Sequence, residues 1–211
     1  MTTIALFGAT GKTGRRVLSR ALEAGHDVRA LVRDPAKLAM THERLAVIRG
    51  DVLDAATVDE VVAGCSAVLS LFGQVPGSPR TLQTDGTRNI VEAMKRHGIR
   101  RIVTLSGGGL RADGKDEPGI ADHIIRFLLK TLSGHVLADA EGHLAVLRSS
   151  GLDWTVVRAP RLTEAPGKGS YRVGWVGAGS STKISRDDLA AFIMTQVEDT
   201  AFAQQMPFVS E

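Results

Sequence analysis

A glycine-rich loop near the start of the chain combines the residue types that bind a pyrophosphate group. It follows a strand-like run over Thr2–Phe7 and precedes a helical pattern over Arg15–Ala24. Glycines at this spacing permit a tight turn, close approach of the backbone to a ligand, and close packing of a helix on a strand. The anion would lie at the N-terminus of the helix, as in dinucleotide-binding proteins. The loop residues expected to contact such a cofactor are Gly8, Thr10, Gly11, Lys12, Thr13 and Gly14.

The end of the second predicted strand, Asp27–Val32, carries the residues that distinguish NAD from NADP. Arg33 and Asp34 lie about 20 residues past the last glycine, where a side chain meets the adenosine ribose. A carboxylate there would accept from the 2′-hydroxyl of NAD, whereas a guanidinium would pair with the 2′-phosphate of NADP. Asp34 precedes Pro35 and has the pattern of a helix N-cap. We therefore expect Arg33, with Lys37 as a second cation, to favour NADP(H) over NAD(H); the alternative for Arg33 is a surface salt bridge.

Two further strand ends should complete the cofactor site. The predicted strand over Ala46–Ile48 is followed by Asp51 and Val52. The Asp51 carboxylate could accept a hydrogen bond from the adenine amino group or could cap a turn, and the sequence favours neither role. The predicted strand over Ala67–Phe72 leads into a glycine, and a small residue there lets the cofactor backbone pass closely. The residues expected to contact the cofactor at this end are Leu71, Phe72 and Gly73.

The length of 211 residues indicates one domain over residues 1–211. Lysine and arginine total 26 and aspartate and glutamate total 23, which gives a net charge of +3. The positive residues form no basic block, so the chain suits an anionic cofactor better than nucleic acid. The single cysteine, Cys65, excludes an intrachain disulfide and indicates a reducing compartment. Without a signal-like start or a long apolar run, we expect a cytoplasmic protein with no membrane association.

Apolar runs alternate with helical patterns along the chain, which predicts a Rossmann-type, doubly wound parallel sheet with helices on both faces. The alternation breaks where glycine and proline accumulate. We expect residues 160–184 and 203–211 to form a small lobe on the substrate side, with strands near Tyr171–Val173 and Met206–Val209. Further strands are predicted over Arg101–Leu105 and Trp154–Val157, and further helices over Ala55–Ala63, Leu82–His97 and Ala138–Ser150.

Six segments of the chain, read together, match a known pattern. They are Gly8–Gly14, Leu31–Asp34, Gly50–Leu53, Gly86–Val91, Ser150–Thr155 and Lys183–Ala190. They resemble the atypical short-chain dehydrogenase/reductase superfamily of NAD(P)-binding, NmrA-like proteins. The resemblance is greatest to the group of NADPH-dependent flavin reductases and biliverdin-IXβ reductases. It implies cofactor contacts at the positions named above, at Ser106, and at Pro160, Arg161 and Leu162 beside the nicotinamide.

The usual proton donor of short-chain dehydrogenases is missing. Those enzymes use a Tyr-x-x-x-Lys pair, but the one tyrosine here, Tyr171, is followed four residues later by Trp175. The resemblance suggests Ser106 as an orienting or catalytic residue. His143 is a candidate proton donor, and Arg161 could attract an anionic acceptor. The flavin-reductase group has a hydroxyl-bearing residue in place of Gly107 and a histidine near Arg161, so its mechanism does not transfer directly.

These features favour an NADPH-dependent oxidoreductase that passes hydride to a flavin, a quinone or a similar conjugated acceptor. Such an acceptor is its own electron sink, so the protein needs to supply proximity rather than an acid. The alternative is a non-catalytic NADP(H)-sensing, NmrA-like regulator that acts through a protein partner, and a weaker one is an epimerase or dehydratase with bound NAD. The histidines have no metal-ligand spacing, so no metal is expected. The expected state is a monomer or weak homo-oligomer with a small-molecule substrate.

Overall fold

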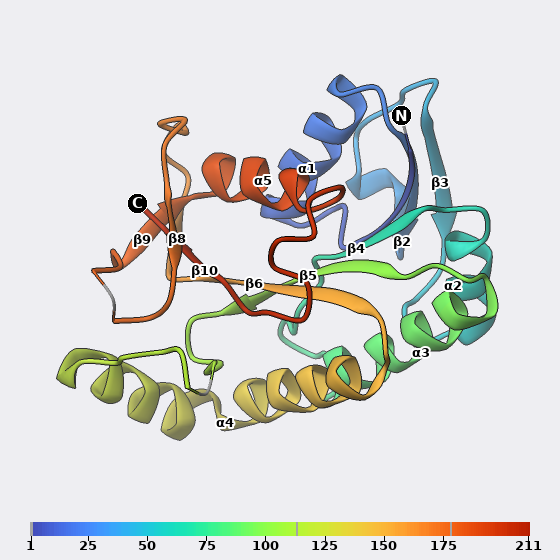
Figure 1. Ribbon diagram of the computed structural model, residues 1–211. Coiled ribbons are helices and arrows are strands. Elements are labelled where there is room, and N and C mark those ends of the chain that lie inside the picture. Colours follow the sequence, from blue (N-terminus) through green and yellow to red (C-terminus); the bar gives the residue numbers. More distant parts are fainter. Residues whose placement is uncertain (1, 113, 178) are drawn as a thin grey trace.

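A mostly parallel sheet of eight strands runs through the centre of the protein (Figure 1). A computed structural model describes residues 2–112, 114–177 and 179–211. The strands are β1 Thr3–Phe7, β2 Asp27–Val32, β3 Leu45–Arg49, β4 Ala67–Ser70, β5 Arg101–Gly107, β6 Asp153–Ala159, β8 Arg172–Gly174 and β10 Phe208–Ser210. Their spatial order is β3-β2-β1-β4-β5-β6-β10-β8. The first six are parallel and follow the doubly wound Rossmann order, in which the chain reverses direction across the sheet between β1 and β4.

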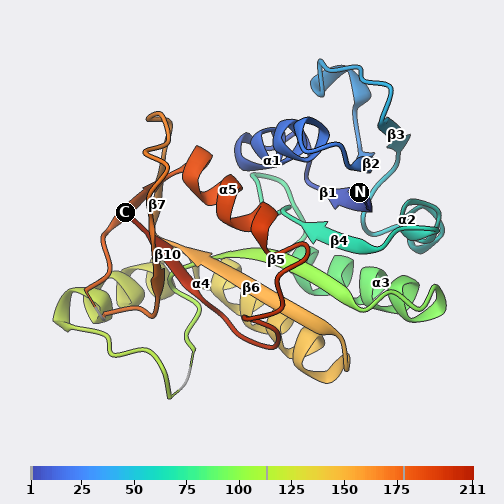
Figure 2. The ribbon, with the colours of Figure 1, turned by 45° about the horizontal axis from the view of Figure 1, so that its top comes forward.

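Helices cover both faces of the sheet and enclose two apolar cores (Figure 2). One face is covered by α1 Lys12–Glu23 and α5 Arg186–Thr195, and the other by α2 Ala55–Val62, α3 Leu82–Arg96 and α4 Ile120–Ser149. Strands with helices on both sides must be apolar on both faces. The sequence meets this requirement, because β4 is buried at all four of its positions and the last four residues of β1 are buried as well.

The last part of the chain differs from the expected lobe. Two short strands, β7 Arg161–Thr163 and β9 Lys183–Ser185, form a separate parallel pair. The strands expected near Tyr171–Val173 and Met206–Val209 exist as β8 and β10, but they extend the main sheet. β10 pairs with β6 in parallel and with β8 in antiparallel orientation. The reason is that the edge of β6 would otherwise leave unpaired backbone groups, and β10 satisfies them.

Two other elements have different limits from those predicted. The helix expected over Ala138–Ser150 is the second half of α4, which begins at Ile120. Its first half presents Ile120, Ile124 and Phe127 to solvent, so no burial pattern marks it in the sequence. The fourth strand ends at Ser70, so the three residues that follow it belong to the loop beyond the sheet.

Candidate functional site

Two adjoining cavities lie at the carboxyl ends of the parallel strands, where ligands of open α/β sheets bind. The first has a volume of about 180 Å³ and lies beyond β1, β2 and β3. The second has a volume of about 360 Å³ and lies beyond β5 and β6. Both cavities are lined by Leu71, Phe72 and Gly73 from the loop after β4. An extended ligand could therefore occupy both across this shared wall.

The glycine loop forms one side of the first cavity, and its geometry accounts for each glycine. Gly8 has a φ of +90°, and a Cβ there would lie 2.7 Å from the carbonyl carbon of Leu71. A Cβ on Gly14 would lie 2.0 Å from the carbonyl oxygen of Gly8, so a side chain would push α1 off the loop. Gly11 is the N-cap of α1 and has no side chain that caps the helix. The first-turn N–H groups of α1 therefore remain available for an anion.

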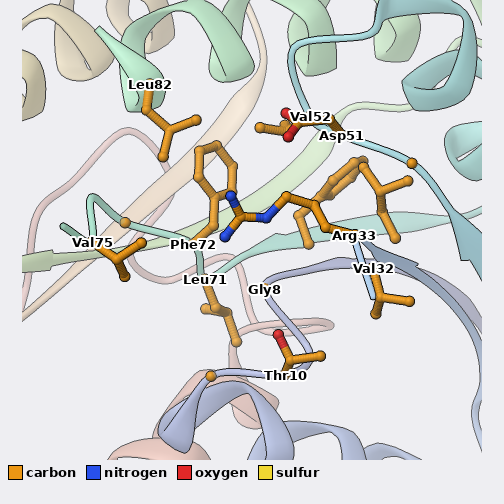
Figure 3. A pocket seen from close by; sticks show the side chains of 15 residues that line it. Gly8, Thr10, Val32, Arg33, Asp51, Val52, Leu71, Phe72, Val75 and Leu82 are labelled. Atoms are coloured by element: carbon orange, nitrogen blue, oxygen red, sulfur yellow. The ribbon is translucent and has the colours of Figure 1, made fainter. Parts of the chain in front are cut away.

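Arg33 reaches across the first cavity from the end of β2 (Figure 3). Its side chain has no hydrogen bond or ion pair with any residue that the structure describes. Asp34 does not line the cavity; it caps the 3₁₀ turn Pro35–Lys37 by accepting from the N–H of Ala36 at 3.2 Å. The neighbouring arginine and aspartate thus have separate tasks, and only the arginine is free to meet a ligand.

Four of the residues expected to contact the cofactor line neither cavity, namely Lys12, Thr13, Gly14 and Lys37, and the side chains of the first two and the last have protein partners. Lys12 Nζ lies 3.3 Å from Glu164 Oε1, and its side chain is largely exposed. The buried hydroxyl of Thr13 accepts a hydrogen bond from Arg186 Nη1 at 3.0 Å. Lys37 Nζ lies 3.8 Å from Asp34 Oδ2 on the exposed turn. Each of these three side chains thus has a protein partner, and its contact with a cofactor phosphate stays a prediction.

The wall opposite the glycine loop is formed by Asp51, Val52 and Phe72 (Figure 3). Asp51 Oδ1 accepts from the N–H of Leu53 at 3.0 Å, so the turn role is present, and the residue also lines the cavity. Gly86 on α3 makes room for this wall, since a Cβ there would lie 2.9 Å from the Phe72 ring and from Val52 Cγ2. The glycine in the Gly86–Val91 segment is therefore explained by packing against the cavity wall.

Ser106 lies at the carboxyl end of β5 and lines the second cavity together with Pro160 and Leu162. The residue is only 9% exposed, and its hydroxyl has no partner among the described residues. The sequence alone missed several other lining residues. They are Gln74 in the loop after β4, Gln83 in the first turn of α3, and Val136, Leu137 and Ala140 on α4. Val136 and Leu137 precede the predicted helix start at Ala138, and nothing in the sequence marks Ala140 as facing a cavity rather than the core.

A buried carboxylate fixes the wall between the second cavity and α3. Asp139 on α4 accepts from the backbone N–H groups of Gln83 and Thr84, each at 2.8 Å. It also accepts from the Thr84 hydroxyl at 2.8 Å and from Gln74 Nε2 at 2.7 Å. Asp139 thus caps α3 from another helix and holds the loop that carries Gln74.

A buried ion pair fixes the opposite side of the same cavity. Arg158 on β6 is fully buried and forms two hydrogen bonds with Asp116, at 2.6 Å and 2.8 Å. Its guanidinium also donates to the carbonyl oxygens of Leu110 and Met206. The Arg158 guanidinium and the backbone N–H groups of Ala112 and Val176 help to hold the pKa of Asp116 below its usual value, against the opposing effect of burial. The pair therefore ties the loop after β5, which includes the cavity residue Leu110, to the sheet.

Two of the predicted catalytic residues lie away from the cavities. His143 is buried between α3, α4 and β5, with Nδ1 2.7 Å from the Thr87 hydroxyl and Nε2 3.1 Å from the Thr104 hydroxyl. Burial lowers the pKa of His143 to about 4, so the ring is neutral at pH 7 and serves packing rather than proton donation to a ligand. Arg161 is exposed on β7 and does not line the second cavity, although its neighbours on both sides do.

The tyrosine is also remote from the site. Tyr171 precedes β8 and packs edge-to-face against Phe192 of α5, with ring centroids 5.8 Å apart. It lines neither cavity. Among the described residues, no group of three histidine, cysteine, aspartate or glutamate side chains is arranged to hold a metal ion. In the same part of the chain, every helix is too short or too polar to cross a membrane.

Comparisons with known proteins agree with this architecture. A profile of the family described as NAD(P)H-binding matches residues 8–200. Cinnamoyl-CoA reductase 1 of Oryza sativa is 34% identical over 116 residues, which are 50% of this chain and only 34% of that longer protein. The uncharacterised protein YwnB of Bacillus subtilis is 27% identical over 206 residues, or 92% of each chain. ChuY, an anaerobillin reductase of Escherichia coli, has the same fold, with a TM-score of 0.78, 23% identity and coverage of 100% of this chain and 97% of that one.

Proposed function

Because the chain belongs to a family of NAD(P)H-binding proteins, we propose that it is an NADPH-dependent reductase that passes hydride to a flavin, a quinone or a similar conjugated acceptor. The observation that carries this proposal is the wall shared by the two cavities. Leu71, Phe72 and Gly73 line both of them. A dinucleotide that follows the strand ends would bring its nicotinamide to this wall, next to an acceptor in the second cavity.

The first cavity suits the phosphate groups of NADPH. The pyrophosphate would lie at the N-terminus of α1, where Gly11 leaves the backbone N–H groups uncapped. Arg33 would pair with the 2′-phosphate, since its guanidinium has no partner among the described residues. Asp34, whose carboxylate would favour NAD, accepts a hydrogen bond from the N–H of Ala36 in the 3₁₀ turn. The unpaired guanidinium of Arg33 and the hydrogen-bonded carboxylate of Asp34 both support NADP(H) over NAD(H).

The second cavity suits the acceptor. NADPH, when bound, supplies the hydride. Ser106 Oγ would donate a hydrogen bond to an oxygen of the acceptor ring, and this bond would strengthen as negative charge develops there. Phe72, Leu110 and Pro160 would exclude water around the reacting ring.

The described lining of the second cavity supports a conjugated acceptor over an isolated carbonyl. Reduction of an isolated carbonyl needs a proton donor at the developing alkoxide. No tyrosine or histidine is among the described residues that line the second cavity. A flavin or quinone accepts the electron pair into its own conjugated ring, and water can supply the proton afterwards.

The test follows NADPH absorbance in the presence of the full chain and of riboflavin, FMN or a quinone. We expect turnover above the uncatalysed rate with at least one of these acceptors. If no acceptor oxidises NADPH faster than in buffer alone, the reductase proposal is wrong.

One observation favours the second candidate, an NADP(H)-sensing regulator that acts through a protein partner. The first half of α4 exposes Ile120, Ile124 and Phe127, at 82%, 55% and 68%, on helical spacing. An apolar stripe of this kind is a surface that a partner can cover. A regulator would bind NADP⁺ and NADPH with similar affinity, would not oxidise NADPH, and would lose its partner when Phe127 is changed to serine.

A further inference from the structure

The side chains that line the second cavity determine whether a charged acceptor would find a partner there. The residues of the described chain that line it carry no charged side chain; its polar side chains are Gln74, Gln83 and Ser106. Its other walls are apolar side chains and glycine backbone. The first cavity differs in this respect, because it contains both Arg33 and Asp51.

The side-chain amide of Gln74 is engaged at both N–H groups, and that of Gln83 at one of its two. Gln74 Nε2 donates to Asp139 Oδ2 and to the carbonyl oxygen of Arg80, both at 2.7 Å. Gln83 Nε2 donates to the carbonyl oxygen of Phe72 at 3.3 Å. All three partners are acceptors, which fixes the orientation of both amide groups. Gln74 can therefore present only its carbonyl oxygen to a ligand, which repels an anion, and Gln83 retains one neutral N–H, which is not a counter-charge.

The charged groups behind the walls are already paired. Arg158 is held by Asp116. Arg126 donates to the carbonyl oxygen of Gly109 and lies 3.2 Å from Glu141, on the other side of the loop after β5. None of these side chains lines the second cavity. An anionic substituent in this cavity would thus lose water without gaining a counter-charge, which is unfavourable.

We infer that the second cavity selects an uncharged, ring-shaped acceptor with a hydrogen-bonding oxygen for Ser106, and discriminates against acceptors whose ring carries a carboxylate, sulfonate or phosphate. This inference rests on the proposed reductase function and specifies its substrate class. In the reaction, hydride from NADPH forms a bond to the quinone, NADP⁺ is released, and one proton from water completes the hydroquinone. The two electrons of the hydride reduce the quinone, so the step is balanced.

The test compares 1,4-naphthoquinone with 1,4-naphthoquinone-2-sulfonate, whose charge is attached to the reacting ring. The sulfonate withdraws electrons and makes the quinone a better hydride acceptor, so intrinsic reactivity opposes the expected selectivity. We expect kcat/KM to be at least about tenfold lower for the sulfonate, because its charge is desolvated without a partner. Rates in buffer alone are subtracted for each quinone.

A charge placed at the cavity rim provides the second arm. Val136 lines the second cavity and is 38% exposed, so Val136→Lys can add an ammonium group there without burying it. The ratio of interest is kcat/KM for the sulfonated quinone divided by kcat/KM for 1,4-naphthoquinone. We expect this variant to raise that ratio by about fivefold or more. Ile124→Lys adds the same charge to an exposed position of the same helix outside the cavity, and should leave the ratio unchanged.

The outcomes separate the acceptor inference from the reductase function. Turnover of both quinones with equal kcat/KM, or the same ratio change in Val136→Lys and Ile124→Lys, overturns the inference and leaves the function intact. Binding of NADP⁺ without turnover of either quinone, riboflavin or FMN overturns both. Binding of NADP⁺ is followed by thermal shift for every variant, which also establishes that each one is folded.

Discussion

Removal of the Arg33 guanidinium should change the choice of cofactor without disturbing the fold. Arg33 is exposed and has no ion pair or hydrogen bond with the described residues, so Arg33→Ala removes no interaction of the folded protein. A charge-assisted hydrogen bond to a phosphate contributes about 1.5–3 kcal/mol, and exposure to water favours the lower end of this range. We therefore expect the Kd for NADP⁺ to rise by roughly 10- to 30-fold.

Isothermal titration calorimetry at constant ionic strength would measure both cofactors. NAD⁺ lacks the 2′-phosphate, so its Kd should change by less than about twofold in Arg33→Ala. Lys37→Ala is the matched control, because it removes one positive charge from the following turn and the residue does not line the cavity. An unchanged preference for NADP⁺ over NAD⁺ in Arg33→Ala, or an equal loss in Lys37→Ala, would refute the role of Arg33.

Three further predictions test the structure around the site. The pKa of His143 is about 4 in the folded protein against an ordinary value of 6.5, so the unfolded chain takes up a proton first as the pH falls. The contribution of His143 to the free energy of unfolding, measured with urea, should decrease by about 3 kcal/mol between pH 6.5 and pH 4. His143→Gln should therefore show a smaller decrease over this range. Equal dependence of the unfolding free energy on pH in the two proteins would contradict this. Gly14→Ala places a methyl group against the carbonyl oxygen of Gly8 and should abolish the thermal shift by NADP⁺, whereas Gly134→Ala, which has open space, should retain it. Ser106→Ala should lower kcat with a quinone by about tenfold and leave the Kd for NADP⁺ unchanged; an unchanged kcat would exclude the hydrogen bond to the acceptor.

The first cavity could be predicted because its residues follow local patterns. Each strand, turn and helix up to residue 72 is recognisable within a short window, and parallel strands bring their carboxyl ends to one edge. Gly8, Arg33, Asp51 and Phe72 therefore fall at their expected places. Lys12 does not line the cavity, and its ion pair with Glu164 could not be predicted, because Glu164 comes from a segment far along the chain.

The second cavity depends on contacts that no short window contains. Val136 and Leu137 belong to a stretch of α4 whose helical start lacks a recognisable apolar face. The Arg158–Asp116 pair joins residues from two segments, and a lone arginine in an apolar strand gives no sign of its partner. His143 is a candidate proton donor on the sequence because its helix is expected to border the site, but in the structure its side chain is buried in the core.

The most direct measurement of hydride transfer uses NADPH that carries deuterium on one face of C4. The protein is incubated with each of the two diastereomers and 1,4-naphthoquinone, and the NADP⁺ formed is analysed by mass spectrometry. A bound nicotinamide beside the second cavity presents one face to the acceptor, so deuterium should be lost from only one diastereomer. Equal loss from both, at the uncatalysed rate, or recovery of unreacted NADPH would contradict the proposed reductase.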